Sequence, residues 1–114
     1  MSMLAERLEL LFGTDTITAH AKHVCEAAIQ HFIVPGEEKK YTKLITHLAM
    51  ALTRIERKEV LNAPPGDLME EIVQSEHYGQ ARQNVAWIAS ICNAELPDEE
   101  RQYLEMHFVH VLTD

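Results

Sequence analysis

The segment Leu96-Pro97-Asp98-Glu99-Glu100-Arg101-Gln102-Tyr103-Leu104-Glu105-Met106-His107-Phe108 carries a clear fold signal. Pro97 has no backbone donor, which a helix tolerates only at its start, and Asp98 is a suitable N-terminal cap. Apolar residues then recur at helical spacing: Leu104, Phe108, Val111 and Leu112. The pattern predicts a helix with this stripe facing a core, and it places His107 on the rim of the stripe.

Helical spacing of apolar residues recurs along the rest of the chain, and no segment alternates with the period of a strand. The expected inward residues are Leu4, Leu8, Leu11 and Phe12; Ile17, Ala21, Val24, Ala28 and Phe32; Leu44, Leu48, Ala51, Leu52 and Ile55; Leu68, Met69, Ile72 and Val73; Tyr78, Ala81, Val85, Ile88, Ala89 and Cys92. Gly13 is expected to end the first helix as a left-handed cap, Asp15 or Thr16 to begin the second, and Asp67 to cap the short helix after Pro64-Pro65-Gly66. The sequence therefore predicts an all-α fold, a compact single-domain bundle of five to six helices over residues 1–114.

Charge and composition exclude several functional classes. The chain has 114 residues, with 18 acidic and 10 basic side chains and a net charge of −8. A nucleic-acid binder needs clustered cations, so direct binding to nucleic acid is not expected. We expect a cytoplasmic protein without membrane association, because there is no bilayer-length apolar run and no signal-peptide pattern. Cys25 and Cys92 lie in apolar stripes and lack metal-binding spacing, so they are predicted to be buried, reduced thiols.

His47 lies on the rim of another stripe, in Thr46-His47-Leu48-Ala49-Met50-Ala51-Leu52-Thr53-Arg54. Helical geometry predicts that His47, Ala51 and Arg54 form one edge, with room for an anion between the imidazole and the guanidinium. Arginine binds phosphate through paired hydrogen bonds, and histidine changes its charge near neutral pH. The alternative is that His47 and His107 are ordinary boundary residues of amphipathic helices.

Other chemistry has less support in the sequence. The pairs His20/His23 and His107/His110 are each one helical turn apart, but zinc sites normally have three or four ligands at characteristic spacings. We therefore expect no metal and no cofactor, and elemental analysis would test the His20/His23 pair. There is no GxSxG motif and no glycine-rich phosphate loop, so the protein is not expected to be an enzyme. The carboxylates of the last helix are expected to form a solvated face: Glu99, Glu100 and Glu105.

Both histidine segments resemble those of the PTS regulation domain (PRD) family. The first resemblance consists of Thr46-His47-Leu48 through Ala51 and Arg54, and the second of Leu96-Pro97-Asp98-Glu99, Tyr103-Leu104 and His107-Phe108. Tyr78-Gly79-Gln80-Ala81 is similar to the segment that opens the helix between them. The resemblance covers essentially the whole chain. One departure is Thr46, where the family often has an acidic residue.

The resemblance implies an all-helical, commonly dimeric regulator of bacterial sugar operons. It implies that His47 and His107 accept phosphoryl groups from the histidine phosphocarrier protein or the B component of enzyme II, with Arg54 and Glu99 as matching neighbours. Family regulators usually carry two copies of the domain behind a nucleic-acid-binding domain, whereas this sequence has one copy. We therefore expect it to act through a partner, such as a transcription regulator or a second copy of itself. The alternative is an interaction bundle that has lost the phosphorylation chemistry.

Overall fold

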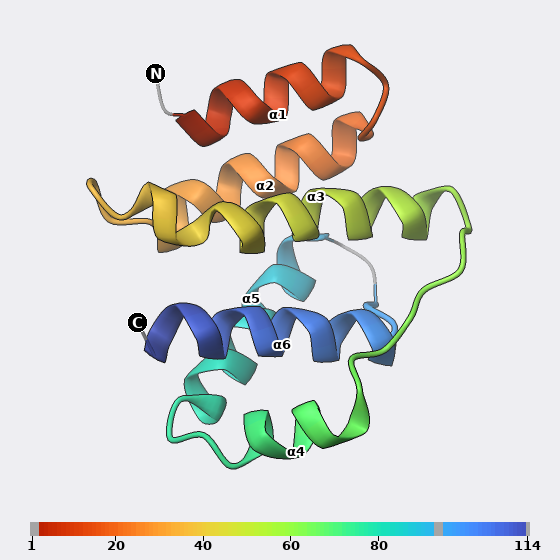
Figure 1. The fold of residues 1–114 in the computed structure, drawn as a ribbon. Coiled ribbons are helices and arrows are strands. Elements are labelled where there is room, and N and C mark those ends of the chain that lie inside the picture. The colour runs from red at the N-terminus through yellow and green to blue at the C-terminus, as the bar shows by residue number, and fades with distance from the viewer. Residues whose placement is uncertain (1–2, 93–94, 114) are drawn as a thin grey trace. The chain divides into compact units, whose positions relative to one another are not determined.

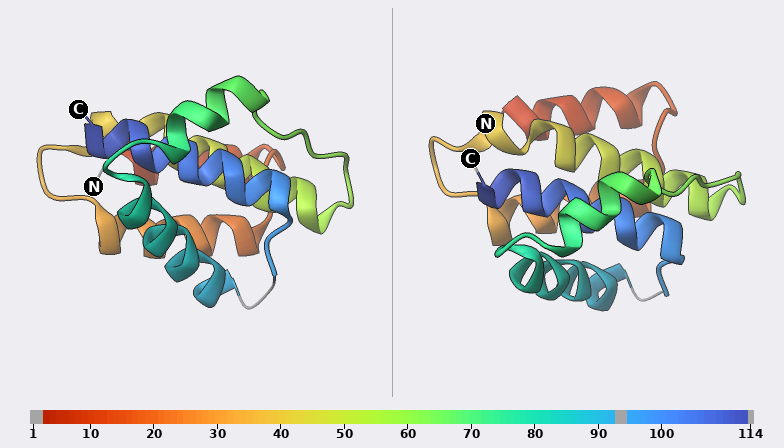
Figure 2. Two further views of the ribbon diagram at one scale, coloured as in Figure 1. Left: turned by 90° about the horizontal axis from the view of Figure 1, so that it is seen from below. Right: turned by 60° about the horizontal axis from the view of Figure 1, so that its bottom comes forward.

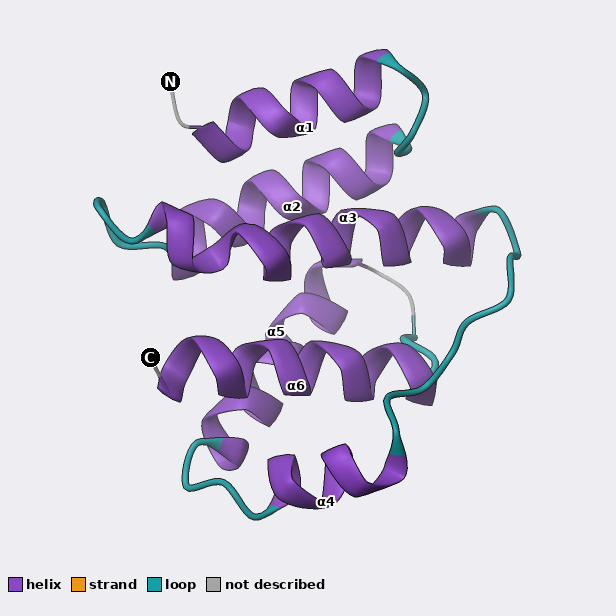
Figure 3. Ribbon diagram, viewed as in Figure 1, coloured by secondary structure: helices purple, strands orange, loops and turns teal. Residues whose placement is uncertain are grey.

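The computed structural model describes residues 3–92 and 95–113, and every regular element within these ranges is helical (Figures 1 and 3). The order is α1 (Met3–Gly13), α2 (Ala19–Phe32), a 3₁₀ turn η1 (Glu38–Tyr41), α3 (Thr42–Glu56), α4 (Gly66–Val73), α5 (Tyr78–Cys92) and α6 (Asp98–Thr113). The all-α class that the apolar spacing predicted is confirmed. The backbone contacts divide the chain into two units, Met1–Val60 and Leu61–Asp114, and each unit is described by itself.

The first unit is a three-helix arrangement in which α2 packs against α3 and α1 contacts both. Successive helices run in opposite directions (Figure 1). Its buried core contains residues of the predicted stripes, together with Ile45 and Ala49, which the stripes did not include. The predicted members are Leu4, Leu8, Ile17, Ala21, Val24, Cys25, Ala28, Leu44, Leu48, Ala51 and Leu52. Burial of one leucine side chain contributes about 1.5–3 kcal/mol. The Glu38 carboxylate of η1 accepts a hydrogen bond from the Leu4 backbone N–H at 2.6 Å, which satisfies a free donor at the start of α1.

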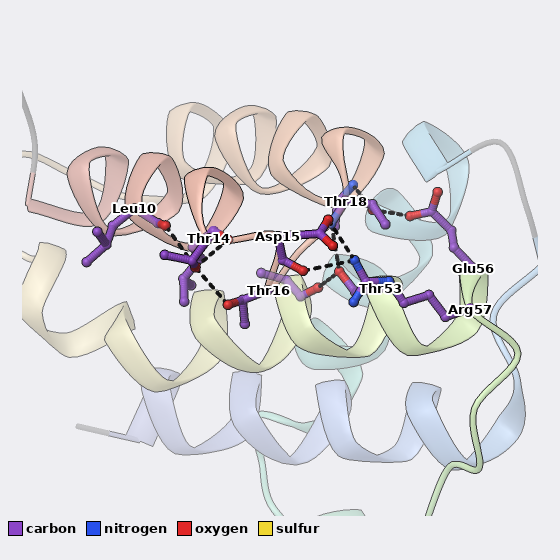
Figure 4. Close-up of polar contacts among 11 residues, drawn as sticks. Leu10, Thr14, Asp15, Thr16, Thr18, Thr53, Glu56 and Arg57 are labelled. Carbon is purple, nitrogen blue, oxygen red and sulfur yellow. Dashed lines mark hydrogen bonds and ion pairs between the residues drawn. The ribbon is translucent and has the colours of Figure 1, made fainter.

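A polar cluster joins the start of α2 to the last turns of α3 (Figure 4). Thr18 is the N-cap of α2, and its hydroxyl accepts from the Ala21 N–H at 3.1 Å and donates to the Glu56 carboxylate. The Thr18 N–H donates to the Thr53 hydroxyl at 3.1 Å, and that hydroxyl donates to the Ala49 carbonyl at 2.9 Å. Thr53 is only 3% exposed, so its hydroxyl is a buried link between two helices.

The turn between α1 and α2 differs from the sequence prediction. Gly13 is the last residue of α1, and the left-handed residue is Asp15, with φ 60°. The Arg57 Nη2 atom donates to the Asp15 carbonyl at 3.0 Å and lies 3.2 Å from its Oδ1 atom. Asp15 and Thr16 were expected to cap α2, but the buried Ile17 follows them and Thr18 is the cap. The predicted caps were therefore wrong, because tertiary contacts hold this turn.

Replacing Thr53 with valine is expected to lower the free energy of unfolding by about 1–3 kcal/mol, because the Thr18 N–H loses its acceptor. Thr113→Val is a matched control, since Thr113 also donates to the carbonyl four residues earlier, that of Val109, at 2.6 Å. The control should change stability by less than about 1 kcal/mol. Urea denaturation followed by circular dichroism measures both, and equal losses would contradict the proposed link.

The second unit is formed by α4 and α5, which both pack against α6. Figure 2 shows α4 lying obliquely across α6. The buried apolar residues are Ile72, Ala81, Val85, Ile88, Cys92, Leu96, Leu104, Met106, Phe108, Val109 and Val111. Two cap predictions were again wrong. Pro65 is the cap residue of α4, and Asp67 lies inside the first turn. In α6 the Pro97 carbonyl accepts a hydrogen bond from the Arg101 N–H at 2.9 Å, so Asp98 lies inside the helix. Both aspartates still favour their helices through the dipole at the N-terminus.

Charge is distributed unevenly between the two units. Residues 1–60 contain eight acidic and eight basic side chains, whereas residues 61–114 contain ten acidic side chains and two arginines, Arg82 and Arg101. The net charge of the whole chain, −8, therefore belongs to the second unit. Within the described residues, no helix combines the length and the apolar character that crossing a membrane requires.

Candidate functional site

His47 and His107 each lie beside a buried stripe of their helix. His47 lies in the second turn of α3 and His107 in the middle of α6, and both side chains are partly exposed. The residue after each histidine is in the core: Leu48 is 0% exposed and Phe108 is 1% exposed. Each imidazole is therefore held on a packed helix while its ring remains accessible to solvent, as the apolar stripes predicted.

The exposed edge of α3 differs from the predicted one. Ala51 is fully buried in the core of the first unit, so it does not lie between His47 and Arg54 on the surface. Met50 is the residue that does, because it is partly exposed and lies one turn from each of them. Arg54 is exposed in the last turn of α3, two turns beyond His47, or about 10 Å along the helix axis.

Two cations beside the His47 segment were missed by the sequence prediction. Lys43 is exposed one turn before His47 on the same helix, and its spacing of four residues was a usable signal. Arg7 belongs to α1, and its Nη1 atom donates to the Thr46 hydroxyl at 3.4 Å. Thr46 directly precedes His47, so Arg7 places a positive charge near the start of this site. No local pattern indicated Arg7, because the contact depends on how α1 packs against α3.

The acidic residues of α6 correct a second prediction. Glu99 is partly exposed in the first turn of α6, about 12 Å along the axis before His107. Glu100 is 2% exposed and Glu105 is 4% exposed, so these two do not form part of a solvated face. Glu100 and Tyr103 lie on the same helical stripe as His107, seven and four residues before it. The phenol of Tyr103 therefore lies one turn from His107, and the buried Glu100 carboxylate lies two turns, or about 10 Å along the axis, from it.

The described residues contain other reactive groups besides these two histidines. Among the described residues, no three side chains of His, Cys, Asp or Glu are grouped so as to hold a metal ion. Burial raises the pKa of the Cys92 thiol to about 11, which makes it a poor nucleophile at neutral pH. Burial and the nearby Glu105 carboxylate raise the pKa of Tyr78 above its usual value. His23, His31 and His110 are more exposed than His47 and His107, so exposure alone does not distinguish the two predicted acceptors.

The comparison with protein families matches the PRD domain over residues 22–111. The match runs from α2 into α6 and contains both histidines, Arg54 and Glu99. The chain belongs to the PRD family. Members of the PRD family are generally regulatory modules of the phosphotransferase system rather than catalysts. No curated protein and no solved structure shows a significant match to this PRD.

Proposed function

We propose that this PRD is a phosphorylation-responsive regulatory module in which His47 and His107 accept phosphoryl groups from proteins of the phosphotransferase system. The family match carries the proposal, and it is supported by two partly exposed imidazoles at the rim of buried stripes. The donors are the phosphocarrier protein or an enzyme II B component. The output is sugar-operon expression, reached through a transcription regulator or through dimerisation of this chain.

The transfer reaction requires little from the protein besides an accessible imidazole. A neutral ring nitrogen attacks the phosphorus of a donor phosphohistidine, the donor P–N bond breaks, and a new P–N bond forms. The two bonds are of the same type, so the exchange is nearly balanced in free energy. At neutral pH the phosphoryl group adds about −1.5 to −2 charges if it behaves like other protein phosphates.

The charge distribution gives the two acceptors different surroundings. A phosphoryl group on His47 enters a unit with equal numbers of acidic and basic side chains, with Lys43 and Arg54 on the same helix. A phosphoryl group on His107 enters a unit that already carries a net charge of −8. We propose that Arg54 attracts the incoming group on α3, and that Glu99 contributes to the donor contact at the start of α6. Local changes of charge such as these bias a protein interface.

The decisive experiment is phosphorylation in solution. The chain is incubated with the phosphocarrier protein, its kinase, an enzyme II B component and phosphoenolpyruvate, and intact mass is measured at alkaline pH, where phosphohistidine survives. The wild type is expected to gain one or two phosphoryl groups. His47→Ala and His107→Ala should each remove the group on that residue, and the double variant should remain unmodified.

His110→Ala is the matched control, because His110 is an exposed histidine on the same helix as His107. It should be phosphorylated to the same extent as the wild type. An unmodified wild type in the presence of all these donors would rule out phosphoacceptance and favour the interaction bundle. Persistent phosphorylation of the double variant would show that the acceptors lie elsewhere in the chain.

A further inference from the structure

The second unit contains a cleft that the phosphorylation chemistry does not use. It is formed by α4, the first residue of α5 and α6, and its volume is about 510 Å³. Its wall includes two apolar side chains of α4, Met69 and Val73, and Val73 is 50% exposed. Glu70, Tyr78, Arg101 and Glu105 provide the charged and polar lining. The oblique crossing of α4 over α6 in Figure 2 marks the place.

Glu105 is the most informative residue of this lining. Its side chain is only 6% exposed, yet it has two weak partners: the Tyr78 hydroxyl at 3.3 Å and the Arg101 Nε atom at 3.9 Å. Arg101 has a closer partner, because its Nη1 atom lies 2.9 Å from Asp98. An ionised carboxylate has about four acceptor sites. Glu105 therefore has acceptor sites to spare and lines an open cleft.

The lining of the cleft favours a peptide ligand that combines positive charge with apolar side chains. The exposed Glu70 adds a second carboxylate to the lining, and the unit as a whole carries ten acidic residues against two arginines. One of these, Arg101, also lines the cleft, but Asp98 offsets its charge. Met69 and Val73 offer apolar surface beside these carboxylates. Grooves between helices commonly bind an amphipathic helix through its apolar face. Charge complementarity then selects helices that carry lysine or arginine next to that face.

We propose that the α4–α6 cleft binds a cationic amphipathic helix of a partner protein. A lysine or arginine of that helix contacts Glu105 and Glu70, and its apolar residues cover Met69 and Val73. This interaction gives the module a second surface for protein contacts, on the same helix as His107.

The test uses fluorescence anisotropy with the full chain and a fluorescein-labelled helical peptide, which has leucines along one face and lysines flanking it. A second peptide has glutamate in place of every lysine. The lysine peptide is expected to bind and the glutamate peptide is not. Glu70→Gln and Glu105→Gln should each weaken binding about tenfold, since each removes one charged hydrogen-bond acceptor.

Glu71→Gln is the matched control, because it removes the same charge from an exposed neighbour of Glu70 that does not line the cleft. It should change the dissociation constant less than about twofold, as expected for a screened surface charge. Equal weakening by Glu70→Gln and Glu71→Gln would overturn the proposal in favour of unspecific attraction. Absence of binding by the lysine peptide would also overturn it. Glu70 is exposed, so its variant keeps the test valid even if Glu105→Gln alters the fold.

Discussion

Replacing Phe108 with alanine is expected to lower the free energy of unfolding by about 3–5 kcal/mol, the usual cost of truncating a buried phenylalanine. Phe108 is 1% exposed and belongs to the core of the second unit, where α4 and α5 pack on α6. Domains of this size are stable by only about 5–15 kcal/mol, so the variant should lose a large part of its stability. Urea denaturation measures the loss.

Phe12→Ala is the control for this prediction, because the same atoms are removed from a side chain that is 43% exposed. Phe12 still contacts the Lys22 ammonium, which lies 5.7 Å from the ring centroid, so a small loss of about 1 kcal/mol or less is expected. Similar losses for the two variants would mean that Phe108 does not support the core. The result also bears on the acceptor, since Phe108 holds the α6 turn that carries His107.

Alkylation of Cys92 is expected to be at least about a hundredfold slower in the folded protein than in the unfolded chain. Its thiol is 3% exposed, and burial raises its pKa from 9.0 to about 11, so the reactive thiolate is about a hundredfold rarer near pH 8. Iodoacetamide labelling followed by mass spectrometry measures the rate with and without urea. A Cys25→Ala variant leaves Cys92 as the reporting thiol, and a folded rate close to the unfolded rate would contradict the burial.

The same pKa shift sets the direction of a pH effect on stability. The thiol ionises at lower pH in the unfolded chain than in the folded one, so its contribution is fully present below about pH 9. That contribution is lost as the pH rises from about 9 to about 11, because the unfolded state then releases the proton first. Stability should therefore fall over this alkaline range.

Much of the fold was predictable because apolar spacing responds to burial, and each of the six α-helices of the described residues buries part of its predicted stripe. The predictions for Phe12 and Val73 were wrong: both were expected to face inward, but they are 43% and 50% exposed. Leu44, Leu48 and Leu52 in α3, and Leu104 and Phe108 in α6, are buried as predicted. Those stripes also defined the partly exposed rims on which His47 and His107 lie. The sequence contains this information because a helix repeats its facing residues every three to four positions.

The prediction errors arose where contacts with a segment distant in sequence determine the position of a residue. Thr18 caps α2 because Thr53 and Glu56 of α3 hold it through hydrogen bonds. The local sequence alone pointed to Asp15 or Thr16 as the cap. Charge alone suggested that Glu105 is solvated, yet the Tyr78 hydroxyl and the packing of α5 on α6 accommodate it in a buried place. The contact of Arg7 with Thr46 likewise joins residues thirty-nine positions apart.

The Thr53 hydroxyl restricts how this sequence can diverge. It must accept a hydrogen bond from Thr18 N–H and donate one to the Ala49 carbonyl, in a space that is 3% exposed. Valine fills the space but has no acceptor, and alanine has neither the volume nor the oxygen. Serine is the one other residue that keeps a hydroxyl on the β-carbon. Position 53 is thus expected to alternate between threonine and serine among descendants of this protein, while exposed neighbours such as Glu59 and Val60 vary more widely.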